Sequence, residues 1–436
     1  MIVSVCYLLL FLFVGLLLAR RAVPDADSAV LLPLGCGLGV SLLAVLPALF
    51  ALPFGFTLSA AGLAGAAAAV LGGVLLRCGT RLHGTAKDPD CGASWACLLP
   101  VAAVTLFLLH THVLHMVNGT LHTGQSCYGD MPMHLGFIKY IAQSGEFLPR
   151  YPLLGGTHRF GYPFLCETVS SVFVVLGADL RTAYLLPMLP AFLSVYGMFW
   201  QLARRVTDSV GKACLAFYLF FYGQRAWVCV LSRLCRQLCG HFHGVLHNAD
   251  EFCGENIEWV NPIVDLLIPQ RATLFGWCVL LPAVYLLWRF CYEGERRLWP
   301  WLAAAGAGLA CGYLDREDAG LFLLPFAAAA TVIVAVVLAG RRRWKALAAQ
   351  VIPYVMLGVG VLTFCTLNYT HYGVFALSDF SEGSFAAAMG AMMRVDTDST
   401  APYLSVPADA REKNLRRCAG IGAAGLLAGG GRPAAE

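Results

Sequence analysis

The chain has 436 residues, of which 58% are apolar and only 13% charged, with a net charge of +4 and a mean hydropathy of +0.69. A water-soluble globular protein needs more surface charge than this composition provides. The basic residues lie in short clusters between apolar runs, which argues against a nucleic-acid partner and indicates a polytopic membrane protein.

Apolar runs long enough to cross a bilayer recur along the chain. Because a bilayer core of about 30 Å requires about 20 apolar residues per helix, we expect an all-α integral membrane fold of about ten transmembrane helices. The expected spans are 2–19, 29–51, 57–76, 95–116, 183–203, 210–223, 272–290, 299–313, 319–340 and 347–367.

Lys and Arg gather in alternate connections between these spans. Since basic loops resist translocation, we expect these connections on the inner side of the cell membrane. The other connections and both termini are expected on the outer face. The resulting organisation is N-terminal spans 1–116, an outer loop 117–182, further spans 183–368 with an outer loop 224–271, and a weakly patterned outer tail 369–436.

The first outer loop contains two helix-like stretches. "DMPMHLGFIKYIAQSG" (130–145) begins with an acid at an N-cap position, has Pro132 just inside and ends at Gly145, with an apolar stripe of Leu135, Ile138 and Ile141 or Ala142. "YPFLCETVSSVFVVLG" (162–177) is too short for a normal crossing. We interpret it as a juxtamembrane helix lying along the outer membrane face.

Asp130 and His134 are the first candidates for chemistry. They are one helical turn apart, so both side chains are expected on one face near the membrane surface. Asp130 is suited to accept a proton from a hydroxyl, with His134 orienting it, donating to phosphate or helping to hold a metal. The alternative is that Asp130 only caps the helix and His134 sits at the interface.

Arg271 follows the second outer loop, where the chain begins a span. A guanidinium there is suited to a lipid phosphate, because it stays charged and offers a forked set of donors. Asn261 and Asp265 precede it and are expected to line the same cavity. Snorkelling of Arg271 to the headgroups is the alternative.

Two other polar groups are weaker candidates. Asp315, Glu317 and Asp318 crowd one short turn, which could bind a divalent cation or a sugar or simply be solvated. The histidines of "HTHVLH" (110–115) and "HFHGVLH" (241–247) match no standard metal spacing, so we interpret them as interfacial.

The stretch "YGDMPMHLGFIKYIAQSGEFLPRYP" (128–152) resembles the first outer loop of GT-C glycosyltransferases, polytopic enzymes that use lipid-phosphate-linked sugars. In the protein mannosyltransferase and aminoarabinose transferase branches, that loop also opens with an acid before a juxtamembrane helix. It then passes a turn similar to "SGEF" (144–147) and reaches a Pro-aromatic helix similar to "GYPFLCETVSSVFVVLGADLRTA" (161–183). "WVNPIVDLLIPQRATLFGW" (259–277) also looks like a stretch of bacterial membrane proteins of this type. Family members carry an Asp-Glu pair where Met131 follows Asp130, so a second acid is expected from Glu146, Glu167 or the 315–318 turn.

The resemblance implies an inverting transfer of a sugar from a polyprenyl-phosphate donor to an acceptor hydroxyl on the outer face. Asp130 and His134 would be catalytic and Arg271 would bind the donor phosphate. The expected substrate cavity is lined by Tyr162, Glu167, Asn261, Asp265, Asp315, Glu317 and Asp318. The alternatives are a transporter or flippase of a lipid-linked substrate, and a non-catalytic membrane assembly protein.

Overall fold

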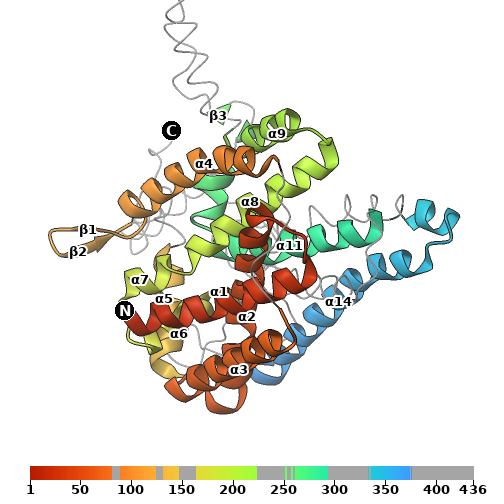
Figure 1. Ribbon diagram of the computed structural model, residues 1–436. Helices are drawn as coiled ribbons and strands as arrows, with labels where there is room; N and C mark the ends of the chain where they lie inside the picture. The colour runs from red at the N-terminus through yellow and green to blue at the C-terminus, as the bar shows by residue number, and fades with distance from the viewer. Residues whose placement is uncertain are drawn as a thin grey trace, which may run out of the picture. The chain divides into compact units, whose positions relative to one another are not determined.

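The structure is a computed structural model of the whole chain (Figure 1). It describes residues 1–80, 89–123, 131–146, 164–222, 251–252, 257–258, 261–292, 332, 335–373 and 375. Contacts divide the chain into two units, Met1–Thr363 and Phe364–Glu436.

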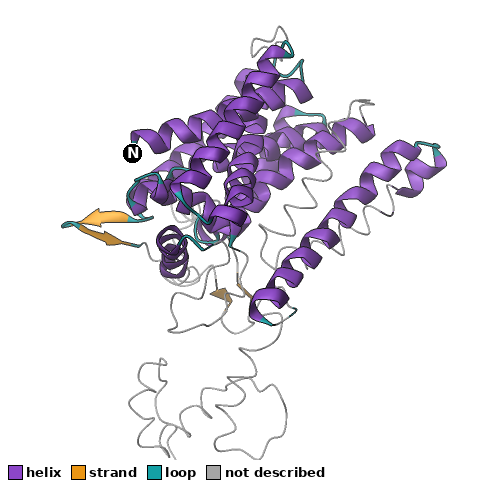
Figure 2. Ribbon diagram, turned by 90° about the horizontal axis from the view of Figure 1, so that it is seen from below, coloured by secondary structure: helices purple, strands orange, loops and turns teal. Residues whose placement is uncertain are grey.

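Helices account for nearly all of the described secondary structure (Figure 2). Within the described ranges, seven helices are long and apolar enough to cross a membrane. They are α1 (Ile2–Ala22), α2 (Ser28–Phe54), α3 (Leu58–Arg77), α4 (Cys91–Thr111), the pair α7 (Leu180–Leu185) and α8 (Met188–Thr207), α11 (Arg271–Tyr292), and α14 (Trp344–Tyr372). This is the helix content expected of a multi-pass membrane protein.

Helices α1 and α2 pack against each other most closely at three glycines. A Cβ atom placed on Gly15 would lie 2.2 Å from the carbonyl oxygen of Gly35 and 2.4 Å from the backbone nitrogen of Gly39. Gly35 and Gly39 form a G-x-x-x-G pattern, which lets two helix backbones approach within a membrane. The same helix α2 also packs against α3, α8 and α11, so it lies at the centre of the bundle.

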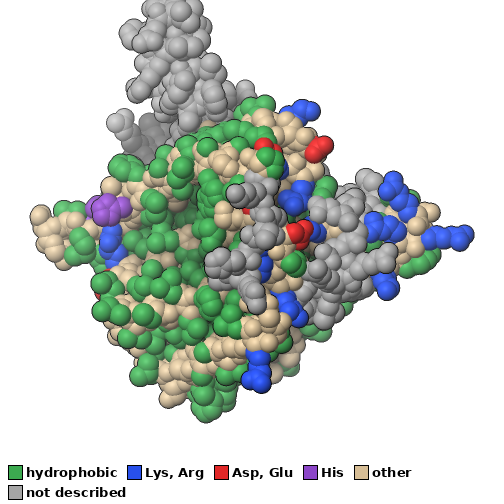
Figure 3. Space-filling view, in the orientation of Figure 1, with side chains coloured by type: hydrophobic (Ala, Val, Ile, Leu, Met, Phe, Trp, Pro, Cys, Tyr) green, Lys and Arg blue, Asp and Glu red, His purple; other side chains and the backbone are tan. Residues whose placement is uncertain are grey.

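Basic side chains collect where one set of helix ends meets. Three polar contacts join these ends: Arg21 Nη1 to the Cys78 carbonyl oxygen at 3.2 Å, Arg204 Nη2 to Asp90 Oδ2 at 2.8 Å, and Arg289 Nη2 to Asp25 Oδ2 at 3.5 Å. In Figure 3, apolar side chains cover much of the face that is drawn, while Lys and Arg gather mainly on its right side. The helix ends therefore alternate as the basic clusters predict; which end faces the cytoplasm stays a prediction.

The opposite helix ends carry the short elements of the first loop. α5 (Met131–Ser144) packs on α6 (Leu165–Val175), and α6 in turn contacts α2, α3, α7 and α11. The backbone N–H of Phe56, after α2, donates to the carbonyl oxygen of Gly145 at 2.8 Å, which fixes the end of α5 against the α2–α3 connection. Gly145 has φ +69°, a left-handed conformation that glycine adopts at helix ends without strain.

A hairpin of β1 (His115–Val117) and β2 (Thr120–His122) projects beside these helices (Figures 1 and 2). Its turn residues Asn118 and Gly119 both have positive φ, as a two-residue type I′ turn requires. The expected span 95–116 is therefore wrong at its end. Helix α4 ends at Thr111, and residues 115–122 form a hairpin around the Asn-Gly turn.

The later part of the described chain contains shorter pieces. α9 (Val210–Tyr222) is followed by the antiparallel pair β3 (Glu251–Phe252) and β4 (Ile257–Glu258), and then by the π-helix η2 (Pro262–Leu267). α9 covers 13 described residues of the span expected at 210–223, and the chain that follows Tyr222 lies outside the described residues, so this crossing stays a prediction. The expected spans 299–313 and most of 319–340 lie outside the described residues, so a count of ten is not confirmed.

Candidate functional site

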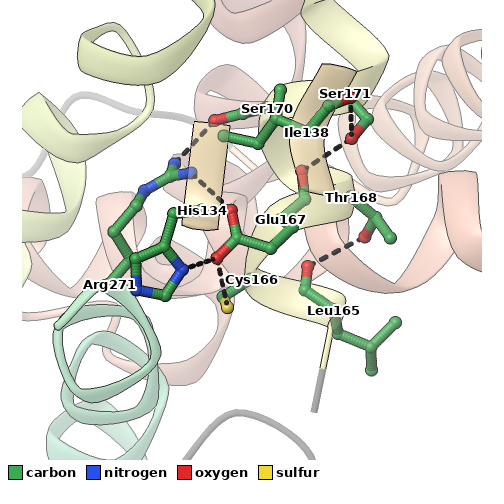
Figure 4. Close-up of polar contacts among 9 residues, drawn as sticks. All are labelled: His134, Ile138, Leu165, Cys166, Glu167, Thr168, Ser170, Ser171 and Arg271. Atoms are coloured by element: carbon green, nitrogen blue, oxygen red, sulfur yellow. Dashed lines mark hydrogen bonds and ion pairs between the residues drawn. The ribbon is translucent and has the colours of Figure 1, made fainter. Parts of the chain in front are cut away.

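A carboxylate–imidazole contact joins the two helices of the first loop. Nδ1 of His134, one turn into α5, lies 2.5 Å from Oε1 of Glu167 in the first turn of α6 (Figure 4). The thiol of Cys166 donates to the same carboxylate oxygen at 3.3 Å. His134 is 2% exposed and Glu167 is fully buried.

The second carboxylate oxygen of Glu167 binds a residue distant in sequence. Nη1 of Arg271, the first residue of α11, donates to Glu167 Oε2 at 3.1 Å, and its Nη2 donates to the Ser170 hydroxyl at 2.6 Å. The guanidinium carbon lies 4.2 Å from the Tyr184 ring centre and 5.2 Å from that of Phe275, close enough for cation–π attraction. The network of His134, Glu167, Ser170 and Arg271 thus links α5, α6 and α11.

Local structure explains how these side chains reach one another. The buried face of α5 consists of Met131, His134, Phe137, Ile138 and Ile141, so His134 lies within an apolar stripe. On α6, Glu167 and Ser170 are three residues apart and share a helix face, while the Ser171 hydroxyl donates to the Ile138 carbonyl oxygen of α5 at 3.1 Å. The stripe therefore differs from the expected one, since Leu135 and Ala142 are only partly buried.

The Glu167 carboxyl is buried between two groups that favour its ionised form. Burial opposes ionisation of Glu167, but His134 and Arg271 together outweigh it, and the pKa of this carboxyl lies below its ordinary value of 4.5. Glu167 is therefore a carboxylate at neutral pH and Arg271 is its counter-ion. An uncompensated carboxylate in this position would be strongly disfavoured.

Several expected site residues are not brought into this network. Asn261 caps η2, because its Oδ1 accepts from the backbone N–H groups of Ile263 and Val264 at 2.9 Å and 3.1 Å. The side chain of Asp265 is not described, and the following expected site residues lie outside the described residues altogether: Asp130, Tyr162, Asp315, Glu317 and Asp318.

His134 and Arg271 are both buried within the protein. Helix α6 covers the face of α5 that carries His134, and the expected position of this residue near the membrane surface stays a prediction. Arg271 is fully buried instead of extending to the headgroups, because Glu167 and Ser170 hold its guanidinium inside the protein. Helix α6 also has a run of buried residues from Cys166 to Phe173, which leaves it no wide face open to lipid.

The network includes two residues that the sequence reasoning missed, Ser170 and Tyr184. The serine pair at 170–171 in an otherwise apolar helix was a signal, because a short hydroxyl side chain in such a helix commonly serves a buried polar partner. Tyr184 gave no signal of its own. Its role depends on the position of α11, which local sequence does not reveal.

No cluster of three or more His, Cys, Asp or Glu side chains with metal-binding geometry occurs in the part of the chain that the structure describes. His115 faces His122 across the hairpin, with ring centres 5.9 Å apart, and His112 Nδ1 lies 2.7 Å from the Thr111 hydroxyl. The histidines of 241–247 lie outside the described ranges.

Comparisons with protein-family models, with curated proteins and with solved structures gave no match to this chain. The fold and site define a helical multi-pass membrane protein with a buried Glu–Arg–His network at one end of its bundle.

Proposed function

We propose that this protein is an integral membrane glycosyltransferase of the GT-C type. It transfers a sugar, with inversion, from a polyprenyl-phosphate donor to an acceptor hydroxyl at the outer membrane face. One observation supports this proposal above the others. The two segments that carry the family resemblance, 128–183 and 259–277, contribute His134, Glu167 and Arg271 to the same buried network.

The chemistry requires few groups from the protein. Lipid phosphate is already a good leaving group, so the reaction needs a proton acceptor for the attacking hydroxyl and positive charge near the departing phosphate. The proposed proton-handling residues are Asp130, which directly precedes α5 in the sequence, and His134 within α5. The π-helix that precedes Arg271 adds support, because π-helical turns are rare and often occur at functional sites.

Arg271 serves the proposed site through its charge. Nη1 and Nη2 donate to Glu167 and Ser170, and Arg271 is fully buried, so a lipid phosphate at the surface does not contact the guanidinium in this arrangement. We therefore propose that Arg271 stabilises Glu167 and adds positive potential beneath the donor phosphate, in place of the direct ligand role that the resemblance implies.

The test is transfer from a labelled polyprenyl-phosphate hexose by purified protein in proteoliposomes, with a lipid and glycan extract of the source membrane as the acceptor pool. We expect a labelled glycoside to form together with free polyprenyl phosphate. Asp130→Ala should lower kcat at least about 100-fold. Asp25→Ala is the matched control, because Asp25 lies at the opposite helix ends, in an exposed pair with Arg289.

Full activity of Asp130→Ala would show that Asp130 is not needed for the reaction. Absence of any transfer by the wild-type protein would refute the proposed glycosyltransferase activity. A second measurement adds an independent check. Mass spectrometry of the lipids that remain bound after mild purification should find a polyprenyl phosphate, which a non-catalytic assembly protein has no reason to retain.

A transporter or flippase of a lipid-linked substrate is the second candidate, and the buried Glu167 favours it specifically. A carboxylate held between an imidazole and a guanidinium is the kind of group that proton-coupled transporters use. This candidate requires movement of the labelled lipid-linked sugar across the vesicle membrane with its phosphate–sugar bond intact.

A further inference from the structure

Basic side chains gather in the turn that directly precedes α14. Positions 341–345 read RRRWK, and the side chains of Arg341, Arg342 and Lys345 are exposed. Trp344, the first residue of α14, is 62% exposed. We propose that this basic turn (341–345) binds the headgroup of an anionic phospholipid whose acyl chains lie along α14. The binding uses no residue of the proposed active site, so it does not depend on the proposed activity.

Backbone hydrogen bonds determine the shape of the basic turn. The helical residues 335–340 end there, because the N–H of Arg342 donates to the Ala339 carbonyl oxygen at 2.9 Å. The N–H of Arg343 donates to the Leu338 carbonyl oxygen at 2.8 Å. Arg342 has φ +52°, the left-handed conformation that this kind of helix ending requires. Leu338 is buried against two alanines of α14, so the charged side chains project from a well-packed support.

The positive charge of the basic turn is not neutralised by neighbouring acids. No Asp or Glu occurs in the sequence between Asp318 and Asp379. Within the described residues, no ion pair involves Arg341, Arg342 or Lys345, whereas two arginines at other helix ends are paired with aspartates. Figure 3 shows Lys and Arg side chains gathered over this end of α14. Exposed positive charge beside a membrane span attracts an anionic lipid surface.

An exposed apolar stripe on α14 begins at Trp344. It continues with Val351, Val355, Val359 and Leu362, each of which is at least 45% exposed. With 3.6 residues per turn, these five positions lie within about 80° of one another around the helix. Since α14 is long and apolar enough to cross a membrane, the stripe is suited to contact lipid acyl chains. The basic turn then lies at the level of the headgroup of the same lipid.

Together, the two surfaces match an anionic phospholipid. Guanidinium groups donate to phosphate oxygens through a planar fork, and Lys binds them as a point charge. A Trp ring at the end of a span is typical of the headgroup region, where its N–H can reach polar groups. A zwitterionic lipid offers the same chains, but its own cationic group offsets the phosphate charge. A free phosphate offers the charge without the chains.

The experiment measures which lipid lies against Trp344. The full chain is reconstituted in vesicles with equal amounts of phosphatidylglycerol and phosphatidylcholine, one of which carries bromine on its acyl chains and quenches any Trp that it contacts. The signal of Trp344 is the fluorescence that Trp344→Phe lacks. From its quenching we expect an affinity for phosphatidylglycerol at least about tenfold higher than for phosphatidylcholine. This preference should fall as salt is added, because salt screens exposed charges.

Two pairs of substitutions test the role of the basic turn. Arg341→Gln combined with Arg342→Gln should lower the preference at least about fivefold, because it removes two exposed charges next to the lipid. Arg77→Gln combined with Lys212→Gln is the matched control, since it removes the same charge from exposed positions on α3 and α9. The control should leave the preference of the Trp344 site unchanged.

Equal quenching of Trp344 by the two lipids in the wild type overturns the proposal, and so does a control pair that lowers the preference as much as the Arg341 and Arg342 pair. Inorganic phosphate distinguishes a lipid from a free anion. At matched ionic strength it should lower the preference no more than sodium chloride does. If phosphate abolishes a preference that chloride leaves intact, the basic turn binds free phosphate and the lipid assignment is wrong.

Discussion

Glu167 has two partners, and each of its carboxylate oxygens serves one of them. A purely structural ion pair would need only Arg271, whereas the second oxygen holds an imidazole in one orientation. Neither partner is close in sequence: His134 lies 33 residues before Glu167, and Arg271 lies 104 residues after it. The sequence indicated all three residues as candidates for the site, but it did not predict that they contact one another.

Removal of one member of the buried ion pair should cost more than removal of both. Glu167→Met or Arg271→Met alone leaves an uncompensated buried charge, and each should lower the free energy of unfolding by about 3–5 kcal/mol. The double variant should lose much less than the sum, since an apolar pair replaces the ions. Thermal unfolding in detergent checks this prediction, and additive losses would contradict it. Asp90→Ala, in a partly exposed pair with Arg204, should cost at most about 1 kcal/mol.

Protonation of Glu167 at low pH should lower the stability of the protein. Its folded-state pKa lies below the ordinary value of 4.5, so the contribution of its ionised form is fully present above that pH and is lost as the pH falls through the folded value. The melting temperature of the wild type should therefore fall below pH 4.5 more steeply than that of the Glu167→Met and Arg271→Met double variant. If the melting temperatures of the two proteins fell equally as the pH is lowered, groups other than Glu167 would account for the acid sensitivity.

At the scale of elements, sequence periodicity and length predicted the apolar helices well. The observed α1, α2, α3, α11 and α14 overlap their expected ranges, because about 20 apolar residues leave few alternatives to a span. The helix over 131–144 and the short helix before Gly177 are confirmed as elements, since their Pro and Gly signals are local. The hairpin at 115–122 was missed, although its Asn-Gly turn is a local signal that the apolar pattern obscured.

The close contact between α1 and α2 predicts a strong difference between two glycines. Gly15→Ala places a methyl group 2.2 Å from the Gly35 carbonyl oxygen, so the helices must separate, at a cost of about 1–3 kcal/mol. Gly73→Ala, on α3, meets nothing within 4 Å and should stabilise its helix by about 0.5–1 kcal/mol. Thermal unfolding of the two variants in the same detergent tests the packing, and equal effects would contradict it.

At the scale of the whole molecule, alternation of basic clusters predicted which helix ends lie together. The contacts of Arg21, Arg204 and Arg289 join those ends directly. The long-range arrangement at the other end could not be predicted, because α5, α6 and the start of α11 meet through tertiary packing that no local pattern encodes. The GT-C resemblance predicted catalytic chemistry at that end of the bundle, but it did not predict which side chains contact one another there.

Accessible positions at the two helix ends allow the orientation to be measured. An epitope tag inserted after Gly119, in the exposed hairpin turn, should bind antibody in intact cells or spheroplasts. A tag inserted after Arg342, in the turn before α14, should bind only after permeabilisation, because basic loops stay inside. The reverse pattern would invert the assigned topology and move the proposed site to the cytoplasmic face.

Because Glu167 and Arg271 are far apart in sequence, the ribosome completes α6 well before it begins α11. At a synthesis rate of about 5–20 residues per second, Arg271 is added roughly 5–20 s after Glu167, because the two are 104 positions apart. During that interval α6 exists without the cation that compensates its carboxylate. Nascent α6 is therefore expected to stay in contact with water or an insertion factor until α11 arrives, and its burial becomes a late step in the assembly of the protein.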